Sequence, residues 1–241
     1  MRARIADPIL RPRAITSTKA LKMAGRALEP AGLIRDSRHY DFGLSALIIS
    51  GAVAYAYEIL DSIDERLVNA GGERLASLVE LANLSAIVGN LFRNGVSRAS
   101  EGRFTPNAPH KYPDLLGVGP GCSDVEIKVA LENNKPKGHL VKPGPHITVR
   151  YVLAQESGTY NRGRENRGNV VWIWEVRVGT LQETHFNFSN TEGDSGKTAV
   201  INAAGLSALK PVYCDQDRAP VAAESVVLND FRRLSRGDGV A

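Results

Sequence analysis

The chain has 241 residues, of which 43% are hydrophobic and 23% are charged, with a formal net charge of +4. A chain of this length and composition can bury a substantial core, which excludes a wholly disordered protein and favours one large domain. Its two cysteines, Cys122 and Cys214, lie far apart and match no metal-ligand spacing. We therefore expect no disulfide and a reducing, cytoplasmic environment.

The first 36 residues form a basic segment. Between residues 1 and 26 there are seven lysines and arginines and a single acid, Asp7. A basic arm of this kind suits a polyanionic partner such as nucleic acid. Its composition also resembles an organellar transit peptide, but three prolines disfavour the continuous helix of such peptides. We expect an arm over residues 1–36, with one short helix near residues 16–28, and a single domain over residues 37–241.

Two helices are predicted before the middle of the chain. Residues 42–57 carry no charge, but this run is shorter than the roughly 20 residues of a membrane span and contains serine, glycine and tyrosine. We expect a buried helix here, continuing to residue 68, and no membrane association. Leucines at helical spacing predict a second helix over residues 73–92, in which Glu80 interrupts the apolar stretch. A basic loop, residues 93–112, follows it.

The stretch from Tyr112 to Leu131 carries the clearest chemical signal. A Pro-Asp pair at residues 113–114 is followed by eleven residues and then by Glu126 and Lys128. Residues 124–130 alternate strictly between polar and apolar, so a strand would present Glu126 and Lys128 on the same face. A hairpin would bring the carboxylates of Asp114 and Glu126 together as a hard oxygen site for Mg²⁺. Lys128 could hold a phosphate or help deprotonate a metal-bound water.

These residues resemble the signature of the PD-(D/E)xK nuclease superfamily, which includes most type II restriction endonucleases. Pro113-Asp114 matches its first half and Glu126-Ile127-Lys128 its second half, and the resemblance covers about residues 73–155. It implies an α/β fold with a restriction-endonuclease-like three-layer core, in which a mixed central β-sheet is flanked by helices after a helical N-terminal part. We place the catalytic core at about residues 73–178.

The resemblance also implies the roles of individual residues. Asp114 and Glu126 would hold Mg²⁺, for which Mn²⁺ substitutes in such enzymes, and the carbonyl of Ile127 would be a further ligand. Lys128 would orient the scissile phosphate or the attacking water. An acid from the preceding helix often joins such a site, and Glu80 is the candidate, with Glu73 as its substitute; the alternative is an ordinary solvent-facing glutamate.

Polar and basic side chains around this stretch are candidates for DNA contacts. The strands predicted over residues 147–154 and 170–178 would enclose a long hairpin tip with three arginines, a side chain that reads guanine edges in the major groove. The alternative is a mobile surface loop. The candidates are Arg103, Asn107, Lys137, His139, Lys142, His146, Arg150, Arg162, Arg164 and Arg167.

The remaining elements lie near the C-terminus. Residues 181–188 favour a strand, and residues 193–198 resemble a phosphate-binding loop but have Thr191 where its first glycine belongs. We expect instead a helix from about residue 195 to residue 209, a short edge strand at residues 212–214, and a last helix over residues 226–234.

The function that these features favour is that of a Mg²⁺-dependent, sequence-specific double-stranded DNA endonuclease. Relatives of this size act as homodimers, and a restriction enzyme would have a companion DNA methyltransferase. Two alternatives stay open: a repair or recombination nuclease of the same superfamily that recognises DNA structure, and a non-catalytic DNA-binding protein.

Overall fold

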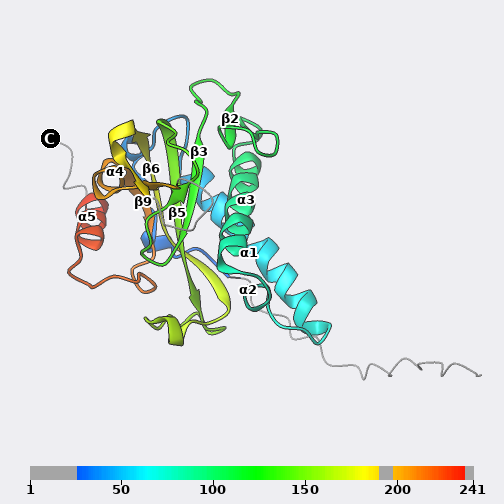
Figure 1. Ribbon diagram of the computed structural model, residues 1–241. Helices are drawn as coiled ribbons and strands as arrows, with labels where there is room; N and C mark the ends of the chain where they lie inside the picture. The colour runs from blue at the N-terminus through cyan, green and yellow to red at the C-terminus, as the bar shows by residue number, and fades with distance from the viewer. Residues whose placement is uncertain (1–25, 190–197, 237–241) are drawn as a thin grey trace, which may run out of the picture.

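The fold is a mixed α/β arrangement, seen here in a computed structural model that describes residues 26–189 and 198–236 (Figure 1). Helices α1 and α3 lie together along one face of a central sheet, and α4 and α5 lie toward its other side. The sheet has the order β3-β5-β6-β9. β3 pairs with β5 in parallel, whereas the other two pairs are antiparallel. The expected mixed sheet flanked by helices is therefore confirmed at this level.

The central strands follow the alternating patterns in the sequence. They are β3 (Glu126–Leu131), β5 (Gly144–Ala154), β6 (Val170–Leu181) and β9 (Lys210–Cys214). β5 and β6 form the predicted long hairpin, with the short 3₁₀ helix η3 (Arg164–Asn166) in its tip. β9 lies at the sheet edge, as expected, where the missing N–H of Pro211 is tolerated.

The first helix is α1 (Ala46–Asn69), which begins at Ser45, whose side chain accepts a hydrogen bond from the Ile48 N–H. By length and mean hydropathy, 1.4, it is the one helix among the described residues that could cross a membrane. Its Ile49 and Val53 side chains are fully buried, and the Tyr57 hydroxyl contacts the backbone of Ile173 in β6. α1 thus packs as the buried helix that its composition predicts.

The predicted helix over residues 73–92 is wrong in its bounds. A short α2 (Leu75–Leu78) is followed by an extended break, and α3 runs from Leu81 to Ala99. The break arises because the first turn is tied to α1: Asp64 accepts from the Leu75 N–H and pairs with Arg74. Glycine allows α3 to approach α1 closely, since a Cβ on Gly95 would lie 2.7 Å from Ala52 Cα.

The other face of the sheet is polar and is covered by smaller elements. A second sheet has the order β4-β8-β7, from β4 (Lys137–Gly138), β8 (Thr198–Ile201) and β7 (Phe186–Ser189). The buried Arg177 donates to the carbonyls of Leu206 and Leu209, at the end of α4 (Ala203–Ala208). The remaining elements are the β1–β2 hairpin (Phe104–Pro106 and Leu115–Gly117), the 3₁₀ helices η1 (Pro30–Gly32), η2 (Ser37–His39) and η4 (Glu183–His185), and α5 (Val226–Ser235). α5 confirms the helix predicted over residues 226–234.

Several predicted boundaries differ from the structure. Residues 26–36 are not part of a free arm, because Ile34 is buried and its N–H donates to Val212 and because Arg26 pairs with Asp61. The helix expected over residues 195–209 is instead β8 followed by α4, since residues 198–201 pair with β4 and β7. Residues 16–25 of the short helix expected near residues 16–28 and the phosphate-loop-like residues 193–197 lie outside the described residues, and residues 26–28 are not helical.

Candidate active site

Glu126 and Lys128 lie on the polar face of β3, as their alternation predicts. The Glu126 side chain is 1% exposed, and its Oε1 accepts hydrogen bonds from Nζ of Lys128 and, at 2.7 Å, from Nζ of Lys142. Its second oxygen, Oε2, is buried with no hydrogen-bond partner among the described residues. Glu126 is thus a buried carboxylate with two ammonium neighbours and one unused oxygen.

Asp114 reaches the same strand from the Pro-Asp turn. The turn contains a cis peptide bond between Tyr112 and Pro113, and Leu115 bridges to Val125 in antiparallel fashion. Oδ2 of Asp114 accepts a hydrogen bond of 2.8 Å from the Ile127 N–H. This bond places the Asp114 carboxylate at the outer edge of β3, close to the two residues that flank Ile127.

The two carboxylates have opposite electrostatic surroundings. Burial raises the pKa of Asp114, only partly offset by the bond from the Ile127 N–H, and the charge of Glu126 raises that pKa further. Burial alone would also raise the pKa of Glu126, but Lys128 and Lys142 outweigh burial and hold that pKa below its ordinary value. The effect of the Glu126 charge on the pKa of Asp114 means that the two acids lie within electrostatic reach of each other.

Asp114, Glu126 and Ile127 offer oxygen atoms of the kind that Mg²⁺ prefers. Mg²⁺ takes one or two protein carboxylates and keeps several waters, so it needs no cage of protein ligands. Asp114 and Glu126 supply two carboxylates, with Glu126 Oε2 free, and the Ile127 carbonyl faces the same strand edge as its N–H because both point the same way from an extended residue. Within the described ranges no group of three or more His, Cys, Asp and Glu side chains is gathered to hold a metal.

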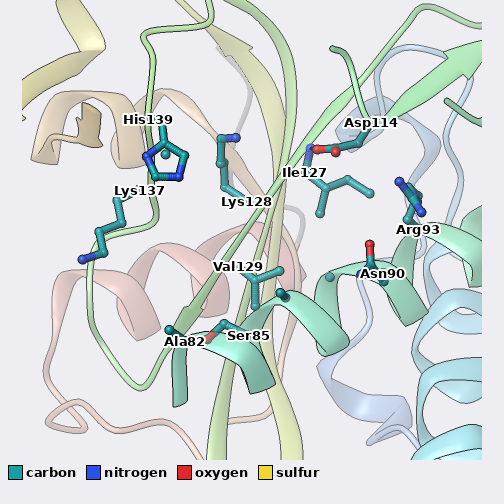
Figure 2. Close-up of a pocket in the computed structure, with 13 residues that line it drawn as sticks. Ala82, Ser85, Asn90, Arg93, Asp114, Ile127, Lys128, Val129, Lys137 and His139 are labelled. Atoms are coloured by element: carbon teal, nitrogen blue, oxygen red, sulfur yellow. Dashed lines mark hydrogen bonds between the residues drawn. The ribbon is translucent and has the colours of Figure 1, made fainter. Parts of the chain in front are cut away.

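A cavity of about 400 Å³ opens between α3 and the outer edge of β3 (Figure 2). Asp114 and Lys128 line it; Lys137 and His139 lie on one side, and Asn90 and Arg93 on the other. Nε of Arg93 is buried without a hydrogen-bond partner among the described residues. The cavity therefore exposes one carboxylate and several cationic side chains to a ligand.

Glu126 does not line this cavity: its side chain is buried, and Lys142, from the segment after β4, bonds to it. Lys142 Nζ lies 4.8 Å from the centroid of the Tyr112 ring, and the Tyr112 hydroxyl donates to the Pro143 carbonyl at 2.9 Å. The residue next to the Pro-Asp turn thus fastens the segment that carries Lys142 onto Glu126.

The prediction that a glutamate of the preceding helix completes the site is wrong. Glu80 occupies the N-cap position of α3, is exposed and does not line the cavity. Thirteen residues separate it from Arg93, or about 20 Å along the helix. Glu73 is also exposed and lines a different hollow, beside Arg74 and Glu156.

Asn90 and Arg93 of α3 take the place expected for that acid. Arg93 belongs to the helix and not to the basic loop in which the sequence placed it. The helix wall of the cavity also includes Ala82, Ala86 and Gly89, and a Cβ on Gly89 would lie 3.1 Å from Val129. Small residues at helical spacing, ending in an arginine, were the sequence signal that could have identified this wall.

Some of the candidate DNA contacts surround the site. Lys137 and His139 line the cavity, and Lys142 binds Glu126. Arg164 and Arg167 line a second hollow at the other end of β3, and Nε and Nη2 of Arg167 donate to the two carboxylate oxygens of Glu132 at 2.7 and 2.9 Å. The tip of the β5–β6 hairpin therefore lies at the opposite end of the sheet from β2 and the Pro-Asp turn (Figure 1).

Other candidates are engaged within the protein. The prediction that Arg150 and His146 contact DNA is wrong. Arg150 is buried in an ion pair with Glu175, and His146 is fully buried with its Nδ1 bonded to the Gly144 carbonyl. Asn107 braces the turn: its side chain donates to the Pro113 carbonyl. The exposed Arg103 donates to the Pro120 carbonyl and Arg162 to the Val221 carbonyl.

Comparison with known proteins adds no family assignment. The chain matches no protein-family model, and no curated protein matches it significantly. Function must therefore be inferred from the chemistry of the site itself.

Proposed function

We propose that the protein is a Mg²⁺-dependent DNA endonuclease that hydrolyses phosphodiester bonds, of the type II restriction kind that the sequence resembles. The observation that carries the proposal is the bond from the Ile127 N–H to Asp114 Oδ2. It holds the Asp114 carboxylate at the outer edge of β3, the strand that carries Glu126 and Lys128, and this supports the arrangement that the motif would require. The mixed sheet with α3 along one face is compatible with a restriction-endonuclease-like core.

Each residue of the site would have its own role. Asp114, Glu126 and the Ile127 carbonyl would hold Mg²⁺, which when bound polarises a phosphoryl oxygen and acidifies a water. Lys128 would exchange its contact with Glu126 for one with the scissile phosphate or the attacking water. Arg93, whose Nε has no partner among the described residues, would donate to a phosphate oxygen beside Asp114.

A structure-directed nuclease is the second candidate, and the hairpin tip favours it. Sequence reading would need free arginine side chains, but Arg162 bonds to the Val221 carbonyl and Arg167 to Glu132. Of the three arginines, Arg164 has neither a hydrogen bond nor an ion pair to the described residues. A homodimer and a companion methyltransferase belong to the restriction proposal and would not be needed by this candidate.

The test is incubation of plasmid or phage DNA with the full-length protein, in Mg²⁺ or in EDTA, followed by electrophoresis. Discrete bands in Mg²⁺ alone are the result expected of a site-specific endonuclease, and a smear would favour the structure-directed or nonspecific enzyme. Intact DNA in both conditions, with binding retained, would leave a non-catalytic DNA-binding protein. The Asp114→Asn protein purified in the same way excludes a contaminating nuclease.

A further inference from the structure

The cavity at Asp114 is one end of a longer groove along the outer edge of β3. A second hollow, of about 820 Å³, shares Ala82, Ser85, Val129 and Lys137 with the first. Together they form a continuous channel that we call the β3-edge groove. α3 is one wall, the segment Asn134–His139 is the other, and Asp114 and Arg167 mark the ends.

The β3-edge groove is strongly basic. Six lysine and arginine side chains line it, and Asp114 is its one carboxylate among the described residues. Two of the six are neutralised by neighbours, since Lys128 binds Glu126 and Arg167 binds Glu132. Within the described ranges the other four, Arg93, Lys135, Lys137 and Arg164, make no ion pair. Unpaired cations that line a channel attract a polyanion and track its backbone.

The shape of the groove suits one strand and not a duplex. Its helical wall includes the small residues Ala82, Ser85, Ala86 and Gly89, and no Phe, Tyr or Trp side chain of the described residues lines either hollow. Hollows of about 300–1,000 Å³ hold ligands of drug size, which is one or a few nucleotides each. Along β3 the groove spans about 15 Å, from the rise of its residues. Hollows that hold one or a few nucleotides each accommodate part of one strand and not both strands of a duplex.

The strand edge adds a backbone donor to the cationic side chains. β3 is an outer strand of its sheet, and the Ile127 N–H points outward to Asp114. Alternate residues of a strand direct their N–H groups to the same side, so the Val129 N–H also points into the groove that Val129 lines. Contacts that cations and backbone N–H groups make to phosphates position a strand and carry no sequence information.

We propose that the β3-edge groove binds one polynucleotide strand through its phosphates and leads it to Asp114. The substrate would therefore be DNA with a single-stranded segment, such as a tail, a gap or a melted site. This inference rests on the proposed function for its cleavage step, but strand binding itself needs neither metal nor chemistry.

The test measures binding by fluorescence anisotropy in EDTA with the full-length protein. The probes are a mixed-sequence single strand, its blunt duplex and the same duplex with a single-stranded tail. The triple variant Lys135→Gln, Lys137→Gln, Arg164→Gln removes three exposed charges from the groove. The matched control, Arg35→Gln, Arg66→Gln, Arg233→Gln, removes three charges elsewhere. Melting curves verify that both variants are folded.

The single strand and the tailed duplex should bind, and the blunt duplex at least tenfold more weakly. The groove variant should lose at least about 30-fold in single-strand affinity while the control changes less than threefold. The slope of the logarithm of the binding constant against the logarithm of the salt concentration should become shallower by about 2 in the groove variant. Each of its three lost phosphate contacts removes about 0.7 from the slope on a single strand. Equal binding of the blunt duplex, or no loss in the groove variant, would overturn the proposal, as would absence of binding by any probe.

Failure of the nuclease proposal gives a different result. If the protein binds single strands in the groove but never cleaves them in Mg²⁺, the groove stands and the catalytic assignment falls. If it cleaves duplex DNA at discrete sites and the groove variant cleaves equally well, the catalytic assignment stands and the groove is not the path of the substrate.

Discussion

The backbone N–H of Ile127 donates to Oδ2 of Asp114 across 2.8 Å, which joins the two halves of the motif. Asp114 and Ile127 are thirteen residues apart in the chain, and the Leu115–Val125 bridge brings them together. The carboxylate is thereby set at the strand edge, where a metal and a phosphate can approach it. The chemistry proposed for this site depends on that placement.

Removal of either acid should abolish cleavage without loss of DNA binding. Asp114→Asn or Glu126→Gln would remove a proposed metal ligand and also a negative charge from the proposed phosphate site, so binding in EDTA should be equal or tighter. Glu80→Gln is the matched control, because Glu80 is exposed at the N-terminus of α3 and its variant should be cleavage-competent. Near-normal turnover by either site variant in a timed cleavage assay would refute the assignment.

Loss of the Lys128 ammonium should slow cleavage without weakening binding to the same degree. Lys128→Ala removes a group that would stabilise charge at the phosphate, and a lost contact of this type costs about 10²–10³ in rate. Single-turnover kinetics on one oligonucleotide would measure the effect. Lys135→Ala, which removes a groove lysine distant from Glu126, should change DNA affinity more than cleavage rate. If Lys128→Ala instead weakened mainly affinity and Lys135→Ala slowed mainly cleavage, the roles assigned to the two lysines would be exchanged.

The two acids should affect stability in opposite directions. Because the pKa of Glu126 is lowered, its contribution is present above its unfolded pKa and is lost as pH falls through the folded pKa. Glu126→Gln should therefore destabilise the protein at pH 7, by about 1–3 kcal/mol, and the difference should shrink in acid. Urea unfolding at several pH values would test this.

Asp114 has a raised pKa, so its contribution is present below its unfolded pKa and is lost as pH rises through the folded pKa. Asp114→Asn keeps an oxygen acceptor for the Ile127 N–H and removes the poorly solvated charge. The variant should have an equal or higher melting temperature than the wild type at pH 7 and no such advantage in acid, below the unfolded pKa. A large loss of stability at pH 7 would show that the charge itself holds the turn.

Arg150 should contribute to the stability of the folded protein and not to its affinity for DNA. It is 3% exposed, pairs with Glu175 and lies 4.3 Å above the Trp174 ring. Arg150→Met removes one of the two ion pairs of the buried Glu175, which keeps Arg177, and should cost about 1.5–3 kcal/mol, as loss of a hydrogen bond to a charged group does. At a temperature where the variant is folded, its DNA affinity should equal that of the wild type; a selective loss of affinity would restore Arg150 as a contact.

The contact between α1 and α3 should be sensitive to a single methyl group. Gly95→Ala would place a Cβ 2.7 Å from the Ala52 Cα and from its carbonyl oxygen, so the helices must separate. We expect a loss of about 1–3 kcal/mol, typical of overpacking, in spite of the better helix propensity of alanine. Asn94→Ala on the same helix should be neutral or stabilising in the same unfolding experiment.

The sequence by itself determined the local features of this protein. The period-two alternation around Glu126 and Lys128 predicted β3, the same pattern predicted the β5–β6 hairpin, and the uncharged run predicted α1. Side-chain periodicity is a local property, so it can be recognised without knowledge of the rest of the chain. The Pro-Asp pair and the strand motif were therefore enough to locate the candidate site along the chain.

Only the tertiary structure decided which faces are covered. Arg150 alternates like a surface residue, but α4 and the second sheet close over that face, and Arg150 pairs there with Glu175. Glu80 interrupted an apolar helical pattern before the motif, but the break after α2 leaves it exposed at the N-cap of α3, and Asn90 and Arg93 line the cavity instead. These outcomes depend on contacts between residues distant in sequence, whose burial and pairing energies no local pattern contains.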